Sequence, residues 1–78
     1  MATEILEGIV VDQDILAGKP IIGGTRISVE MILGLLADGW TESDILKNYP
    51  GLKHENITAC LAYARDVISR ESIYPSAA

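Results

Sequence analysis

Four polar side chains follow the Pro50-Gly51 turn, where a long helix with an apolar stripe is expected to begin: Lys53, His54, Asn56 and Thr58. Asparagine can hydrogen-bond adenine through two atoms, and lysine can contact guanine or phosphate. These residues are therefore a candidate DNA-reading surface, although Glu55 among them would be repelled by phosphate. Polar residues also occupy the first turn of helices that never touch DNA, so the pattern fits both kinds of domain.

The other basic side chains are candidates for contacts with phosphate or with a protein partner. Lys47 lies near the end of the preceding short helix, and Arg65 and Arg70 lie in the second half of the long helix. Arg26 follows the Gly23-Gly24 pair and precedes the first helix. It could position the DNA backbone, or it could form a salt bridge to Glu30 or a neighbouring carboxylate.

Neither catalysis nor metal binding is indicated by the residue types. Catalysis needs a nucleophile, a base and an orienting group in one place, and metal sites usually need several His or Cys ligands. The chain has one histidine, His54, and one cysteine, Cys60, which lies inside an apolar stripe and is expected to be a small core residue. We therefore expect no enzymatic activity, no cofactor and no metal.

Composition and charge restrict the class of protein further. The 78 residues are enough for one domain, and their net charge of −5 argues against a general nucleic-acid coat protein, although a local basic patch could still bind DNA. No signal peptide and no apolar run long enough to span a membrane are visible, so we expect a cytoplasmic protein. Because 49% of the residues are hydrophobic in so short a chain, we expect a homodimer that buries the excess apolar surface.

The basic and polar candidates must be positioned by a hairpin and three helices. Residues 7–12 and 21–27 predict two extended pieces joined by a turn at 14–20, in which Gly18 is expected to have a positive φ. Helices are expected from Ser28 to about Asp38, from Thr41 to about Asn48, and from Lys53 or His54 to about Arg70. We expect residues 7–27 to form a β-hairpin arm, 28–70 a three-helix unit and 71–78 a flexible tail.

The order of helices predicts the fold class. A helix, a very short helix, a tight turn and a long helix are typical of a mainly α, trihelical helix-turn-helix core, homeodomain-like or winged-helix-like, here preceded by the short N-terminal β-hairpin. In the long helix two apolar stripes lie side by side, one with Leu61 and Ile68 and one with Cys60 and Val67. This arc is wide enough to serve both the core and a partner.

The residues from Ile15 to Val29, with their Gly-Lys-Pro, apolar pair, Gly-Thr-Arg and Ser-Val, closely resemble the signature of the bacterial domain-of-unknown-function family 433 (DUF433). The segments 36–42, 45–52 and 57–64 resemble the family's continuation. The resemblance implies a helix-turn-helix fold and a relation to VapB-type antitoxins, whose genes often neighbour a PIN-like ribonuclease. Lys19, Thr25 and Arg26 match the signature, but the resemblance implies no role for them.

Two functions follow from these observations. By the resemblance, the protein would be an antitoxin-like DNA-binding repressor of its own operon that neutralises a PIN-like ribonuclease toxin. In that case Arg65 and Arg70 are the candidate toxin-binding residues, since only eight residues follow the long helix and an arginine could enter the acidic active site of such a nuclease. The alternative, favoured by the acidic balance, is a protein-interaction module with no DNA role.

Overall fold

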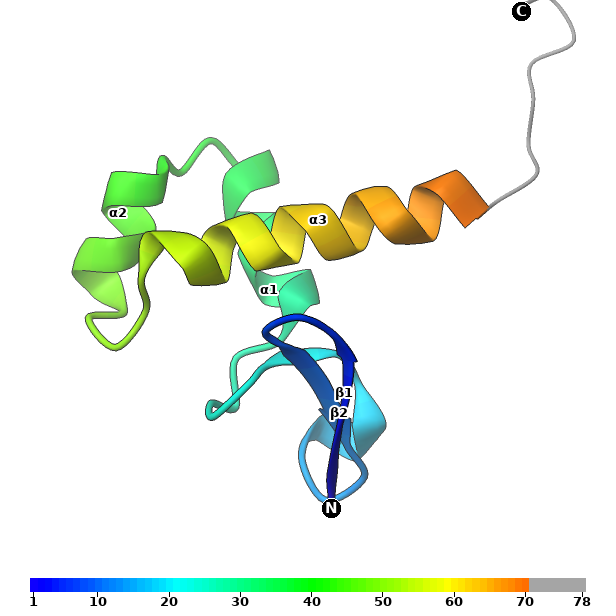
Figure 1. The fold of residues 1–78 in the computed structure, drawn as a ribbon. Coiled ribbons are helices and arrows are strands. Elements are labelled where there is room, and N and C mark those ends of the chain that lie inside the picture. Colours follow the sequence, from blue (N-terminus) through cyan, green and yellow to red (C-terminus); the bar gives the residue numbers. More distant parts are fainter. Residues whose placement is uncertain (71–78) are drawn as a thin grey trace, which may run out of the picture.

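A computed structural model describes residues 1–70 of the chain as a small sheet followed by helices (Figure 1). The elements in order are β1 (Ala2–Leu6), β2 (Ile9–Asp12), the 3-10 turn η1 (Leu16–Gly18), β3 (Ile21–Ile22), α1 (Val29–Ala37), α2 (Glu42–Asn48) and α3 (His54–Arg70). The predicted layout of a β-hairpin followed by helices is confirmed. The tail expected over 71–78 lies outside the described residues.

The sheet differs from the sequence prediction in two ways: it has an additional N-terminal strand, and its last strand is shorter than expected. Its three antiparallel strands have the order β1-β2-β3, so β1 is an additional strand that the residue pattern does not predict. Residues 2–5 are all exposed, which is why they lack the apolar alternation that marks a half-buried strand. The second extended piece pairs only at Ile21–Ile22, because Thr25 then turns the chain: its hydroxyl donates to the Ile22 carbonyl at 2.8 Å and accepts from the Ile27 N–H at 3.0 Å.

Local capping residues set the ends of the helices, as predicted. The Ser28 hydroxyl accepts a hydrogen bond from the Met31 N–H at 3.0 Å and begins α1. Thr41 and Asp44 form a reciprocal capping box at the start of α2, with distances of 2.8 and 3.1 Å. Gly18 has the positive φ that was expected for it in the turn, +82°.

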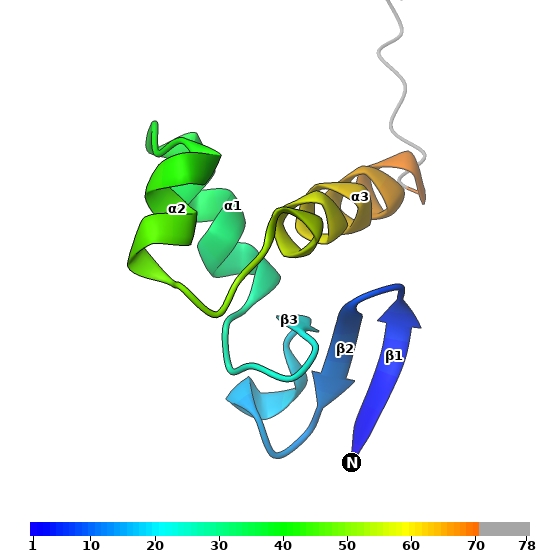
Figure 2. The same cartoon turned by 60° about the vertical axis from the view of Figure 1, so that its left-hand side comes forward.

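The core lies where α3 crosses α1 and meets the sheet (Figure 2). Its buried members come from every layer of the fold: Ile9, Ile22, Val29, Ile32, Ile45, Leu52, Ile57 and Cys60. The wide apolar arc of α3 is divided, since Ile57 and Cys60 are buried whereas Leu61 and Ile68 are exposed. In Figure 1 the C-terminal part of α3 (orange) extends past both α1 and the sheet. None of the helices within residues 1–70 has the length and apolar character needed to cross a membrane.

Candidate functional site

The first turn of α3 uses its polar side chains to build the helix. The Asn56 side-chain oxygen accepts a hydrogen bond from the Lys53 N–H at 2.7 Å, and the Asn56 N–H donates to the Lys53 carbonyl at 2.9 Å. This oxygen therefore satisfies one of the N–H groups that a helix start leaves without a partner. The bond uses one of the two lone pairs of this oxygen and fixes the orientation of the Asn56 side chain.

His54 and Thr58 are also engaged within the molecule. His54 Nδ1 lies 2.7 Å from Glu42 Oε2, which ties the first residue of α3 to the first residue of α2. This hydrogen bond, followed by the charge of the same carboxylate, raises the pKa of His54. The Thr58 hydroxyl donates to the His54 carbonyl at 3.2 Å. Of the four polar candidates, Lys53 is the one whose side chain forms no hydrogen bond or ion pair within residues 1–70.

The remaining DNA-binding candidates, Arg26 and Lys47, are both exposed. Lys47 lies in the last turn of α2, where a cation is favoured by the helix dipole. Of the two alternatives for Arg26, the salt bridge to Glu30 or a neighbouring carboxylate is absent within residues 1–70, where Glu30 instead binds Lys19 Nζ at 3.0 Å. The turn from β3 to α1, which carries Arg26, lies on the same side of the molecule as the α2–α3 connection in both views (Figures 1 and 2).

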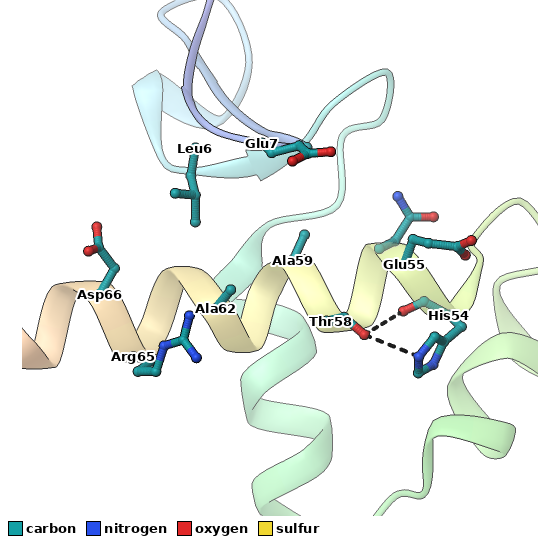
Figure 3. Close-up of a pocket in the computed structure, with 11 residues that line it drawn as sticks. Leu6, Glu7, His54, Glu55, Thr58, Ala59, Ala62, Arg65 and Asp66 are labelled. Atoms are coloured by element: carbon teal, nitrogen blue, oxygen red, sulfur yellow. Dashed lines mark hydrogen bonds between the residues drawn. The ribbon is translucent and has the colours of Figure 1, made fainter.

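A groove separates the β1–β2 turn from α3 and was not predicted by the sequence (Figure 3). Its volume is about 580 Å³, and it is lined by Leu6, Glu7, Gly8, His54, Glu55, Asn56, Thr58, Ala59, Ala62, Arg65 and Asp66. The turn reaches close to the helix: a Cβ on Gly8 would lie 3.4 Å from the Ala59 Cβ. The small side chains at 59 and 62 leave open the space between turn and helix.

The charged residues of the groove differ in whether they have partners. Asp66 binds Arg70 Nη2 at 2.7 Å, an i, i+4 pair on α3. Within residues 1–70, Glu7 and Glu55 form no ion pair, and neither does Arg65. In Figure 3, Glu55 lies at the His54 end of the groove, Glu7 lies above Ala59, and Arg65 lies towards the other end. The charge of Glu55 also contributes to the raised pKa of His54.

Beside the groove, the outer face of α3 is partly apolar and uncovered. Leu61 is 50% exposed and Ile68 is 66% exposed. Arg65 lies between them at i+4 from Leu61, so the three side chains share one face of the helix. The two predicted partner-binding arginines therefore differ in their ion pairs: Arg70 is bound to Asp66, whereas Arg65 forms no ion pair within residues 1–70.

Cys60 is a core residue, as predicted. Its side chain is fully buried, and desolvation raises the pKa of its thiol to about 11. Within residues 1–70 there is no group of three or more His, Cys, Asp or Glu side chains that could hold a metal ion.

Comparison with known proteins identifies a family but no activity. The solved structure of a DUF433 member protein from Anabaena variabilis is similar, with a TM-score of 0.73 and 29% sequence identity over 76% of this chain and 58% of that one, so this chain spans a little over half of that protein. The search of curated proteins found no match. The family model "Protein of unknown function (DUF433)" matches residues 9–64, which leaves β1 and the last residues of α3, including Arg65 and Arg70, outside the match. By this match over most of its length, the chain belongs to the DUF433 family.

Proposed function

We propose that this protein is a protein-interaction module that binds its partner through the outer face of α3. The observation that carries the proposal is the exposure of Leu61 and Ile68, at 50% and 66%, on one face of α3. Two large apolar side chains around an arginine resemble the centre of a protein interface, where arginine and buried apolar contacts contribute most of the binding energy.

The apolar contribution can be estimated from the exposed fractions. Full burial of a Leu or Ile side chain is worth about 1.5–3 kcal/mol. Burial of the exposed part in a complex would contribute about half of this free energy for Leu61 and about two thirds for Ile68. Together they amount to about 1.8–3.5 kcal/mol, or roughly 20- to 350-fold in affinity.

The partner class we propose is a PIN-like ribonuclease, as in antitoxins of the VapB type. The support for it is the relation to these antitoxins that the sequence resemblance implies, together with Arg65, which makes no ion pair within residues 1–70. A guanidinium can bind carboxylates through two parallel hydrogen bonds, so Arg65 could occupy the acidic active site of such an enzyme and block it.

The first test is whether a PIN-like ribonuclease is encoded beside the gene, and the second is co-expression of the tagged chain with that ribonuclease. L61A/I68A is expected to weaken the complex by roughly 20- to 350-fold, and R65A to restore ribonuclease activity. L16A is the matched control, because Leu16 is also exposed, at 44%, but lies in η1 away from α3. Circular dichroism would establish that each variant is folded. A complex that survives L61A/I68A unchanged would refute the proposal.

Operator binding is a second candidate function. Three exposed cations favour it: Lys47 in the last turn of α2, Lys53 just before α3, and Arg26. The net charge of −5 and the internal bonds of Asn56 and His54 weigh against it. Fluorescence anisotropy on the upstream DNA and on a scrambled duplex, at several salt concentrations, separates the candidates. A repressor binds selectively and loses affinity as salt rises, and the K47A/K53A variant reduces the salt slope.

A further inference from the structure

We infer that the free edge of β1 pairs antiparallel with β1 of a second copy of this chain, with Thr3 of the two copies directly opposite each other. The two three-stranded sheets then form one continuous sheet across a two-fold axis. This surface is distinct from the outer face of α3 that carries the proposed function, and the inference needs no partner other than the chain itself.

The outer edge of β1 is uncovered and lacks the usual protection. β1 pairs with β2 along one edge, and within residues 1–70 no strand pairs with the other edge. Residues 1–5 are all exposed, and Figure 2 shows β1 at the outer side of the sheet. Natural proteins blunt such edges with lysine, proline, a bulge or a covering segment. β1 has neither lysine nor proline, and its one irregularity, between Glu4 and Leu6, leaves the stretch Ala2–Glu4 regular and open.

The residues of β1 determine the register. Two antiparallel strands related by a two-fold axis place one residue opposite the same residue of the other copy. Glu4 at this place would bring two carboxylates together, which is destabilising, and each could turn away only by giving up its hydrogen bond from the Gly8 N–H at 3.1 Å. Ala2 would leave the second half of the strand unpaired, and Ile5 lies in the irregular stretch. Thr3 remains: threonine pairs favourably with threonine across strands, and Glu4 then lies opposite Ala2.

In this register the exposed apolar side chains at the two ends of the strand cover one another. Met1 of one copy lies opposite Ile5 of the other, and the axis produces this contact twice. Met1 is 98% exposed and Ile5 is 41% exposed in the single chain. Positions 1, 3 and 5 share one face of the strand because side chains alternate, so both contacts flank the threonine pair on that face. The strand is thus complementary to itself, which identifies the occupant as a second copy rather than an unrelated extended segment.

The test is disulfide cross-linking of the full chain through an introduced cysteine. Cys60 is fully buried and desolvation raises the pKa of its thiol to about 11, so the introduced thiol is the reactive one. In T3C the two cysteines face each other with Cα atoms about 4.5–5.5 Å apart, within the range of a disulfide. With oxidised glutathione, T3C should form a covalent dimer at least about tenfold faster than S43C, because pairing gives the thiols an effective concentration of about millimolar or more. Ser43 is the matched control, since it is also exposed but lies on α2.

The A2C variant reports the register. Its two cysteines lie diagonally across the axis, about 7–8 Å apart, which is too far for an unstrained disulfide. A2C should therefore cross-link more slowly than T3C. A dimer centred on Ala2 would reverse this order and overturn the register.

Sedimentation equilibrium of T3K is a second test that involves no thiol. Two lysines opposite each other on the axis repel, so the affinity of the dimer should fall roughly two- to fivefold. S43K adds the same charge on α2 and should keep the affinity of the wild type, and circular dichroism would establish that each variant is folded.

Three results would overturn the inference: a wild-type chain that stays monomeric at micromolar concentration, T3C that cross-links no faster than S43C, or equal affinities of T3K and S43K. None of these measurements involves the ribonuclease, so their failure is distinct from that of the proposed function. That function fails only if L61A/I68A leaves the complex intact.

Discussion

Replacing Gly8 with alanine is expected to destabilise the protein, whereas replacing Gly34 with alanine is expected to stabilise it. Gly8 lies in the β1–β2 turn with φ of +84°, a conformation that residues with a side chain rarely adopt. Gly34 lies inside α1, and a Cβ built there meets no atom within 4 Å. Both substitutions add one methyl group, so the opposite signs of their effects on stability come from the backbone conformation at each position.

The magnitudes follow from the local conformations. The left-handed conformation costs an alanine about 1–2 kcal/mol. The new methyl at position 8 would lie 3.4 Å from the Ala59 Cβ, an ordinary contact distance, so packing adds little to this cost. In a helix interior alanine is better than glycine by about 0.5–1 kcal/mol. Gly24 isolates the backbone effect, because its φ is +79° and a Cβ there meets no atom within 4 Å.

Thermal unfolding followed by circular dichroism measures these differences. For a domain of this size, 1 kcal/mol corresponds to a shift in Tm of about 4–8 °C. G8A and G24A should lower Tm by similar amounts, and G34A should raise it. If G8A left Tm unchanged, the turn would not hold the conformation described. If G8A cost far more than G24A, contact of the turn with Ala59 would be the dominant effect, and the reasoning from φ would be wrong.

Three further predictions concern the core, the α2–α3 link and assembly. Cys60 is buried, and the pKa of its thiol is raised to about 11. At pH 8 it should therefore react with a thiol reagent at least about a hundredfold more slowly in the native protein than in urea. Rapid labelling of the native protein would contradict the placement of Cys60 in the core. The pKa of His54 is raised above 6.5 by Glu42, so the link stabilises the fold fully below pH 6.5 and is lost as the pH rises through the folded pKa. In urea unfolding, the free energy of unfolding of the wild type should therefore fall over that pH range relative to that of E42Q. Parallel pH profiles of the two proteins would refute the link between His54 and Glu42. The edge of β1, which pairs with no further strand within residues 1–70, predicts a homodimer in sedimentation at micromolar concentration, which a monomeric mass would contradict.

Helix ends could be predicted from the sequence because their causes are local. Ser28 and Thr41 each bond an N–H three residues later, so the residues that set the start of a helix are within one turn of it. Asp44 completes the capping box over the same distance. Gly18 likewise provides the positive φ that its turn needs.

The strand β1 could not be predicted, because nothing in its own residues distinguishes it from an exposed loop. Its residues 2–5 are exposed on both faces, and its order comes from pairing with β2. The candidate site was predicted only in part. Arg65 was named from the sequence, whereas Glu7, Glu55 and the groove between them depend on where the β1–β2 turn meets α3.

The sequence by itself determined the helices, the turns between them and the family to which the chain belongs, because these depend on short-range patterns and capping residues. Only the tertiary structure decided which polar residues are available for binding. Asn56 and His54 form internal bonds, while Leu61 and Arg65 stay uncovered within residues 1–70. The physical reason is that one helix has several faces, and the neighbours that pack against it determine which face remains exposed.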